Sequence, residues 1–404
     1  MRTLFSVGAA FKAAIRFISG SVLVAAIGFS AMHANAQWKD PLETPAMDTL
    51  IAHKSLLLDV TKAGDRFVAV GGHGHIIYSD DQGRTWVQGS VPVISTLTAV
   101  TFVDENTGWA VGHDTVILKT VDGGKTWVKQ FDGFRANDMV VEAAEANLAE
   151  KEAALDKASN SGDDDLIYEA EMALESAAFA LEDAEYDKQD GSTKPLLDLW
   201  FRNKNEGFVI GAYGMMFKTT NGGESWMAWS GNVENPDRFH LNGIAKIDDQ
   251  RLIVVGEAGL ILTSENAGKT WQKMDSGYDG SFFGVITLQN NVQIAFGLRG
   301  NVRRSTDYGQ SWEYVETNTK QMLLGGTDSL GLTAYVVGTG GAFLKGISAG
   351  NKWETKTLSG RINTSTLIEV SADSGEFILV GEGGVKLIDK TGSLLPVTVK
   401  SIEG

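Results

Sequence analysis

The chain has 404 residues, of which 43% are apolar and 21% charged, with 47 glycines, no cysteine and a formal net charge of −16. This apolar fraction is typical of a globular protein rather than a disordered one. The absence of cysteine excludes a thiol nucleophile, a thiolate metal site and disulfides. The acidic balance, without a concentrated basic face, argues against nucleic acid as a partner.

Residues 1–36 are predicted to be a signal peptide. Arg2, Lys12 and Arg16 give a positive start, an apolar run of residues 17–32 follows, and the Ala-Asn-Ala that ends at Ala36 fits the small-x-small cleavage rule. We therefore expect cleavage after Ala36. Export of a chain without cysteine favours the bacterial periplasm. The apolar run is short for a membrane span, and no other long apolar run exists, so no membrane span is expected after cleavage; a retained N-terminal anchor is the alternative.

The segment 37–54, with Pro41 and Pro45, is an irregular lead-in that we expect to pack on the outer surface of the fold. After it, an eight-residue pattern, Thr-Val-Asp-Gly-Gly-Lys-Thr-Trp at 120–127, returns along the chain. Further copies stand at 79–86, 219–226, 264–271 and 305–312, with a worn copy at 346–353.

A glycine precedes each copy, and a seventh glycine begins a copy that lacks its Trp. These glycines are Gly71, Gly112, Gly211, Gly256, Gly297, Gly338 and Gly381, with intervals of 41, 99, 45, 41, 41 and 43 residues. A period near 42 residues predicts an all-β fold, a seven-bladed propeller of four-stranded blades. The single long interval must hold an insertion, which divides the propeller into blades 1–2 (55–133) and blades 3–7 (192–404).

The repeated pattern is an Asp-box, also called a BNR repeat, and its residues have a structural explanation. The Ser or Thr ends a strand, the Asp accepts backbone N–H groups within the turn, and the Gly supplies a positive φ. The Trp begins the next strand and packs against the neighbouring sheet. Five good copies in register indicate the fold and carry no chemistry of their own.

Strands are expected wherever short β-branched or aromatic runs are broken by Gly, Asp and Asn. For blade 1 the expected strands are 56–60, 66–70, 75–79 and 85–88, and for blade 2 they are 97–103, 108–111, 116–120 and 126–129. Blade 3 is expected to resume at 196–201, and blades 4, 5 and 6 from about Leu241, Phe282 and Met322. Blade 7 is expected at 365–370, 376–380, 385–388 and 394–399.

The insertion, 134–191, has the periodicity of two helices. Apolar and small residues alternate in steps of three and four, as in a heptad seam, and Ser159 to Asp163 separates the two runs. This predicts an antiparallel helical hairpin with arms of about 24 residues, roughly 35 Å long. Between Asn137 and Asp190 stand 17 Asp plus Glu against 3 Lys, a balance of −14. The hairpin is either a solvated rod or a docking element. The seam residues are Val141, Ala144, Leu148, Lys151, Leu155 and Ala158, then Ile167, Ala170, Leu174, Ala177, Leu181 and Ala184.

Propeller topology places the loops on two faces, because consecutive strands run antiparallel. The Asp-boxes join third to fourth strands and share one face. The turns between second and third strands share the other face with the links between blades, and the hairpin is expected to rise from that face. Since these turns vary in sequence on a repeated frame, we expect the binding surface there. They are 72–74, 113–114, 212–213, 257–258, 298–299, 339–340 and 382–383.

The arginines and histidines raise two kinds of chemistry. Some Asp-box propellers are sialidases, which need an arginine triad and paired acids; the Arg-Ile-Pro signature is missing, and Arg303 and Arg304 are expected to be exposed strand residues. Arg299 and Arg361 are the remaining arginines considered. His73, His75 and His113 could ligate a metal, but no acidic cluster with ligand spacing surrounds them. We assign no catalytic, cofactor-binding or metal-binding residue and no cofactor.

The longer repeat, as in Val255 to Trp271 and Ile210 to Trp226, resembles the photosystem II stability and assembly factor-like propellers rather than the sialidases. The resemblance covers about residues 55–400 apart from the hairpin, which departs from the photosynthetic members. It implies a non-enzymatic periplasmic scaffold of a non-photosynthetic bacterium that helps an inner-membrane complex, an RND-type exporter, to assemble or operate. The alternative is a carbohydrate-active or carbohydrate-binding propeller that uses aromatic loops such as those of Tyr213 and Tyr278.

Overall fold

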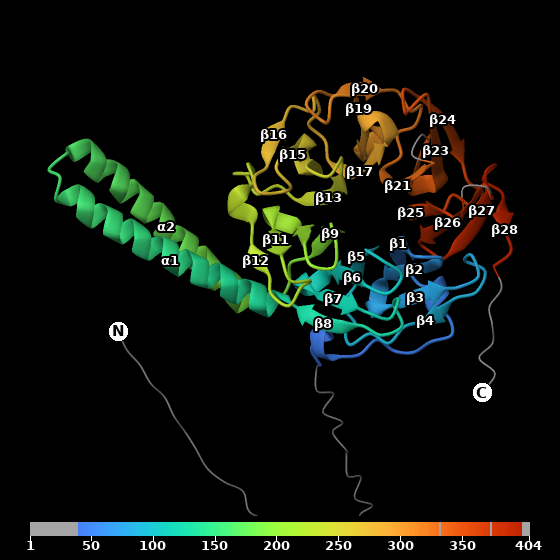
Figure 1. Cartoon of the computed structure of the whole chain (residues 1–404), viewed down its shortest axis with the longest axis horizontal. Coiled ribbons are helices and arrows are strands. Elements are labelled where there is room, and N and C mark those ends of the chain that lie inside the picture. Colours follow the sequence, from blue (N-terminus) through green and yellow to red (C-terminus); the bar gives the residue numbers. More distant parts are fainter. Residues whose placement is uncertain (1–38, 331–332, 372–373, 398–404) are drawn as a thin grey trace, which may run out of the picture. The chain divides into compact units, whose positions relative to one another are not determined.

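The computed structural model describes residues 39–330, 333–371 and 374–397. The predicted signal peptide and the cleavage site after Ala36 lie outside the described residues. Seven sheets, each of four antiparallel strands consecutive in sequence, follow one another around a ring (Figure 1). The predicted seven-bladed propeller is therefore confirmed.

The bounds of the strands are as follows. Blade 1 contains β1 (Leu57–Ala63), β2 (Arg66–Gly71), β3 (Ile76–Ser79) and β4 (Val87–Gln88), and blade 2 contains β5 (Leu97–Phe102), β6 (Gly108–Gly112), β7 (Ile117–Thr120) and β8 (Val128–Phe131). Blade 3 contains β9 (Leu196–Phe201), β10 (Gly207–Gly211), β11 (Met216–Thr219) and β12 (Met227–Ala228), and blade 4 contains β13 (Leu241–Lys246), β14 (Leu252–Gly256), β15 (Ile261–Ser264) and β16 (Gln272–Met274). Blade 5 contains β17 (Phe282–Leu288), β18 (Val292–Gly297), β19 (Val302–Ser305) and β20 (Glu313–Val315). Blade 6 contains β21 (Leu323–Ser329), β22 (Thr333–Gly338), β23 (Ala342–Ile347) and β24 (Lys352–Thr357), and blade 7 contains β25 (Thr364–Glu369), β26 (Glu376–Gly381), β27 (Lys386–Asp389) and β28 (Leu394–Leu395).

The second strand of each blade forms the core. In β6, β10, β14 and β18 every residue is buried, because both faces of the strand pack against neighbouring blades. This explains the continuous apolar runs before each repeated glycine. The outer strands have two to four residues in six of the blades, whereas β24 of blade 6 has six. In blade 7 the outer strand is Leu394–Leu395 and does not include residues 396–397, and the end of the expected range 394–399, residues 398 and 399, lies outside the described residues.

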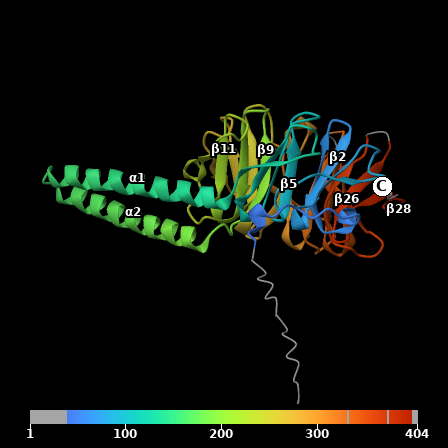
Figure 2. The ribbon, with the colours of Figure 1, turned by 90° about the horizontal axis from the view of Figure 1, so that it is seen from below.

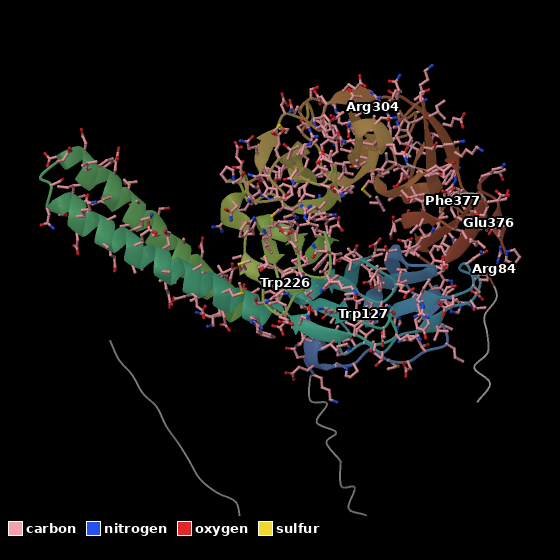
Figure 3. The ribbon with its side chains drawn as sticks, in the orientation of Figure 1. Arg84, Trp127, Trp226, Arg304, Glu376 and Phe377 are labelled. Atoms are coloured by element: carbon pink, nitrogen blue, oxygen red, sulfur yellow. The ribbon has the colours of Figure 1, made fainter. Side chains whose placement is uncertain are left out.

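The Asp-box turn of blade 2 shows why its residues recur. Asp122 accepts hydrogen bonds from the backbone N–H groups of Lys125 and Thr126, both at 3.0 Å, and from the Thr126 hydroxyl at 2.6 Å. Gly124 has a φ of +87°, which an L side chain rarely adopts. The indole of Trp127 donates to the Gly124 carbonyl at 3.0 Å and is almost fully buried. The turn thus fixes the ring that packs between the blades (Figure 3).

Among the residues that the structure describes, blades 1 and 7 each contain four strands consecutive in sequence, so no strand is shared where the ring closes. Arg84 of blade 1 pairs with Glu376 of blade 7 at 2.9 Å (Figure 3). Lys62 donates to the Val370 carbonyl at 3.0 Å. Beneath these contacts lies a joint apolar cluster, made of Ala52, Leu57, Val60, Phe67, Ala69 and Ile77 with Val370, Ile378, Val380, Val385 and Leu387.

The insertion forms two helices, α1 (Gly133–Ser159) and α2 (Asp164–Asp190), between the second and third blades. Asp132 caps α1 and Asp163 caps α2, each accepting backbone N–H groups of the first turn. The predicted helical hairpin is confirmed, and its seam is the predicted one, since every seam residue is at least partly buried. Each helix has 27 residues, about 40 Å. Figures 1 and 2 show both helices running outward beyond the rim of the ring rather than rising from its face.

Candidate docking face

The turns between second and third strands carry a strained residue at their tip. His73, Asp114, Tyr213, Ala258 and Arg299 have φ between +51° and +60°, and the residue after each also has a positive φ. In each turn the N–H of the residue that follows these two donates to the carbonyl of the residue that precedes them; in blade 1, the N–H of His75 donates to the Gly72 carbonyl at 3.1 Å. This is the geometry of a type I′ turn, for which Asn-Gly is favoured.

A residue other than glycine in this conformation costs about 1 kcal/mol. Blades 6 and 7 avoid the strain with Gly340 and Gly383. The side chains of His73, Tyr213 and Arg299 are exposed at their turns. Five of the seven blades therefore keep a side chain at the tip of this turn.

The blade 2 turn on this face anchors the root of the hairpin. The Ser192 hydroxyl donates to the Asp114 carbonyl at 2.6 Å. Thr115 donates to the Lys194 carbonyl with its backbone N–H and its hydroxyl, both at 2.8 Å. The segment that returns from α2 to blade 3 is thus held against blade 2.

The two helices are also tied together at the root. The Asn137 side-chain amide of α1 donates to the carbonyls of Asp187, at 3.2 Å, and Gly191, at 3.0 Å. Lys194 forms an ion pair with Asp187. Ala136 is buried against the cluster that contains Phe131 of β8. The base of the hairpin is therefore fixed to the ring by hydrogen bonds, an ion pair and apolar packing.

Exposed aromatic and charged groups surround this root. The ring of Tyr213, 56% exposed, lies 5.6 Å from the Lys194 ammonium and 5.0 Å, edge to face, from the ring of His240. His240 Nδ1 lies 4.0 Å from a carboxylate oxygen of Glu257. A continuous set of contacts thus runs from α2 to the turn of blade 4.

An apolar pocket of about 480 Å³ opens on blade 1 of the same face, beside the lead-in. Met47 and Ile51 are 77% and 60% exposed at its mouth. The Ser55 hydroxyl meets His75 Nδ1 at 2.9 Å, and burial, with the nearby His73 imidazole adding to it, lowers the pKa of His75, so the ring is neutral at pH 7.

The lead-in was expected to pack on the outer surface of the fold, and it also links the first and last blades. It follows blade 1, where the N–H of Ala46 donates to the Val91 carbonyl at 3.0 Å. It then reaches blade 7, where the N–H of Val385 donates to the backbone carbonyl of His53 at 2.9 Å. The lead-in therefore helps to close the ring.

The arginines weighed for a sialidase triad do not converge. Arg303 donates to the Gly277 carbonyl at 2.7 Å, and Arg304 pairs with Glu313 at 2.7 Å. Both are partly buried, so the expectation that they are exposed was wrong. The Arg303 guanidinium lies 5.6 Å and 5.4 Å from the rings of Tyr278 and Tyr314, and Arg304 Nε donates to the Ala349 carbonyl at 2.8 Å. Arg299 stands on its turn, and Arg361 lines a separate polar pocket of about 250 Å³.

The three histidines weighed as metal ligands are not joined by an acidic group. The rings of His73 and His75 lie 6.0 Å apart. Across residues 39–330, 333–371 and 374–397, no three side chains of His, Cys, Asp or Glu gather in a way that could hold a metal ion.

Two acids on the innermost strands were missed by the sequence reasoning. Burial raises the pKa of Asp59 to about 6 and that of Asp198 to about 7, although each carboxylate accepts two backbone hydrogen bonds, and the negative Asp59 raises the pKa of Asp198 further. One signal was available: the register places Asp59 and Asp198 where other blades have Ala, Gly or Thr.

No helix in the described part of the chain combines the length and apolar character needed to cross a bilayer. The acidic hairpin, although each helix is long, is amphipathic along its seam.

The ring of seven four-stranded sheets, with Asp-box turns on one face, defines a seven-bladed Asp-box propeller. A family model described as "Photosynthesis system II assembly factor YCF48" matches residues 86–164 and 178–330, more than half of the chain. The chain belongs to this family, which confirms the resemblance seen in the repeats.

Individual proteins agree with this assignment. Two curated relatives named "Photosystem II assembly lipoprotein Ycf48" are 28% identical over 125 residues, from Synechococcus sp. (strain CC9902), and 34% identical over 118 residues, from Prochlorococcus marinus (strain SARG). These matches cover 30% and 29% of this chain and 37% and 35% of the relatives, so the chain is matched over about a third of their length.

Among solved structures, "YCF48 bound to D1 peptide" aligns over 86% of this chain and 98% of its own, with a TM-score of 0.57 and 14% identity. "YCF48 from Cyanidioschyzon merolae" aligns over 85% and 97%, with a TM-score of 0.56 and 15% identity. At this level of identity the likeness shows the fold alone.

Proposed function

We propose that this protein is a non-enzymatic scaffold that binds an inner-membrane protein complex, an RND-type exporter, from the periplasmic side. Family membership supports the scaffold role, and the relatives named assembly lipoproteins support a location at a membrane surface. A Ycf48 propeller solved with a D1 peptide supports binding of another protein's segment by such a ring.

The docking role is supported chiefly by the hydrogen bonds that fix the base of the hairpin to the ring. The Asp114 turn holds the return segment through three hydrogen bonds of 2.6–2.8 Å, and Asn137 ties the two helices together. A rod of about 40 Å that served only as a solvated appendage would need no such fixing. Its excess negative charge favours a basic partner and speeds encounter at low salt.

The carbohydrate alternative is supported less well. Tyr278, one of its two aromatic candidates, donates its hydroxyl to the Leu298 carbonyl at 3.0 Å and packs at 5.4 Å against the ring of Phe282. The hydroxyl and ring of Tyr278 are therefore occupied by contacts within the propeller and are not free to bind a sugar. Tyr213 is exposed, but its ring stands beside Lys194 and His240 at the hairpin root.

The test is replacement of residues 137–190 by a short Gly-Ser linker. The propeller should still fold, because the residues that flank the deletion are held at one blade boundary. Affinity purification from detergent-solubilised membranes should recover an inner-membrane transport protein with the intact chain and lose it with the deletion. A variant with exposed Val87, Val121 and Val128 changed to Ala, on the outer part of blades 1 and 2, is the matched control and should retain the partner. Full recovery by the deletion would show that the hairpin does not dock.

A further inference from the structure

The helix α2 carries a second apolar surface that the fold does not use. Tyr168, Met172, Phe179 and Tyr186 are 64%, 49%, 59% and 65% exposed. They are separated by four, seven and seven residues. At 100° per residue they fall within an arc of about 40° and form one line along the helix, about 27 Å long. We call these four residues the outer stripe.

The outer stripe lies on the side of α2 that faces away from α1. The seam residues Ala177 and Ala184 are 3% exposed and point toward α1, roughly half a turn around the helix from Phe179 and Tyr186. The hairpin is therefore held together without the stripe. The opposite side of α1 offers no matching line, because it carries Ala146, Glu150, Ala153 and Lys157 there.

Acidic side chains flank the stripe on both sides. On the helical positions to one side stand Glu171, Glu175 and Glu182, and on the other stand Asp165 and Asp183. All of them are exposed. The single Lys of α2, residue 188, points elsewhere and pairs with Asp138 of α1 at 2.7 Å. The stripe is thus an apolar line with three carboxylates along one side and one near each end of the other side.

This charge pattern selects the occupant. A second copy that placed its own stripe against this one would bring acidic side chains together, which costs free energy at each like-charge contact. A helix with an apolar stripe flanked by Lys and Arg would instead bury the four large side chains and pair its cations with the carboxylates. We propose that the outer stripe docks one basic amphipathic helix of the partner, which lies along α2 as the third helix of a bundle.

This inference rests on the proposed function for the identity of the partner, but its test does not. The probe is a synthetic, fluorescently labelled helix of about 21 residues, long enough to follow the stripe, with Leu along one side and Lys and Arg beside it. A peptide of the same composition with a scrambled order is the control for charge alone. Binding to the purified full-length protein is followed by fluorescence anisotropy.

The variant replaces the outer stripe with alanine: Tyr168→Ala, Met172→Ala, Phe179→Ala and Tyr186→Ala. Alanine favours the helix and leaves every charge in place. The amphipathic peptide should bind the wild-type protein at least ten-fold more tightly than this variant, and the scrambled peptide should bind both equally weakly. The matched control with Val87, Val121 and Val128 changed to Ala should bind like the wild type. Helical circular dichroism equal to that of the wild type shows that the variant keeps its hairpin.

Equal affinity of the wild type and the stripe variant for the amphipathic peptide would overturn the proposal. So would wild-type dimers in light scattering that the stripe variant loses, because a second copy would then be the occupant. If the peptide binds the stripe but no transport protein is recovered from membranes, the proposed exporter partner fails and the docking chemistry stands. If the stripe variant still recovers the transport protein fully while the hairpin deletion loses it, only the stripe is wrong.

Discussion

Asp59 and Asp198 make the same contact two blades apart. Asp59 on β1 accepts a hydrogen bond from the N–H of Val100, on the innermost strand of the next blade, at 2.8 Å, and Asp198 on β9 accepts one from the N–H of Ile244, again on the next innermost strand, at 2.8 Å. Each carboxylate thus links its blade to the following one. Partial burial raises the pKa of both carboxyls, and the negative charge of Asp59 raises that of Asp198 further, so both are protonated more readily than free aspartates.

This arrangement predicts a specific pH dependence of stability. The pKa of each group is raised from 3.8 in the unfolded chain to about 6 or about 7 in the fold, so the folded state binds more protons between those values. The free energy of unfolding should therefore rise as pH falls from about 8 to about 5, by the order of a few kcal/mol from the two groups. Denaturant unfolding of Asp198→Asn should show a smaller rise over this range. The same change at the exposed Asp237 should leave the rise as in the wild type.

The Asp-box predicts a difference between two substitutions at one position. Asp122→Ala removes four acceptor contacts, from the Thr120 and Thr126 hydroxyls and the N–H groups of Lys125 and Thr126, and should lower the free energy of unfolding by about 1–3 kcal/mol. Asp122→Asn should cost much less, because Asn221 of blade 3 makes the same turn with its carbonyl accepting from the N–H of Ser225 at 3.0 Å. Thermal unfolding of both variants measures this difference. Equal losses would mean that the charge, not the acceptor geometry, matters.

Ring closure should depend on apolar packing more than on the Arg84–Glu376 pair. Arg84 is 39% exposed, so a double-mutant cycle on the pair should give at most about 1 kcal/mol. Ile378→Ala should cost about 2–5 kcal/mol, because the side chain is fully buried in the cluster between blades 1 and 7. Urea unfolding compares the two. A pair energy above the cost of the cavity would reverse this ranking.

Within the described residues the arginines do not converge on a triad that could bind a carboxylate, which predicts that purified protein does not hydrolyse sialosides. Arg303 and Arg304 are committed to the Gly277 carbonyl and to Glu313. Product release should stay at the level of a buffer blank in a chromogenic assay. Turnover abolished by changing one acidic loop residue would instead favour the carbohydrate-active alternative.

Most of the fold could be predicted because the repeats have a register. The innermost strands begin at Leu196, Leu241 and Phe282, where the spacing of glycines had placed them, and the helix seam is the one that the heptads indicate. The direction of the hairpin could not be predicted. It depends on contacts at the root, such as Thr115 with Lys194, between residues far apart in sequence.

The candidate site was predictable only in outline. The turns of the second face follow from strand alternation, but their positive φ values do not, since Tyr213 and Arg299 are unusual residues for that conformation. The raised pKa of Asp198 also depends on partners from other blades. The outer stripe can be recognised in the sequence only after the side of α2 that packs against α1 is known, because the stripe lies on the opposite side.

The central claim, that the hairpin is the docking element, is tested most directly by photo-crosslinking in living cells. A photoreactive phenylalanine derivative is placed at Phe179, on the outer stripe, or at Val121, 69% exposed on the Asp-box turn of blade 2. The account predicts that Phe179 yields an adduct with an inner-membrane transport protein, identified by mass spectrometry, and that Val121 does not. An adduct with that protein from Val121 alone, or from neither position, would contradict it.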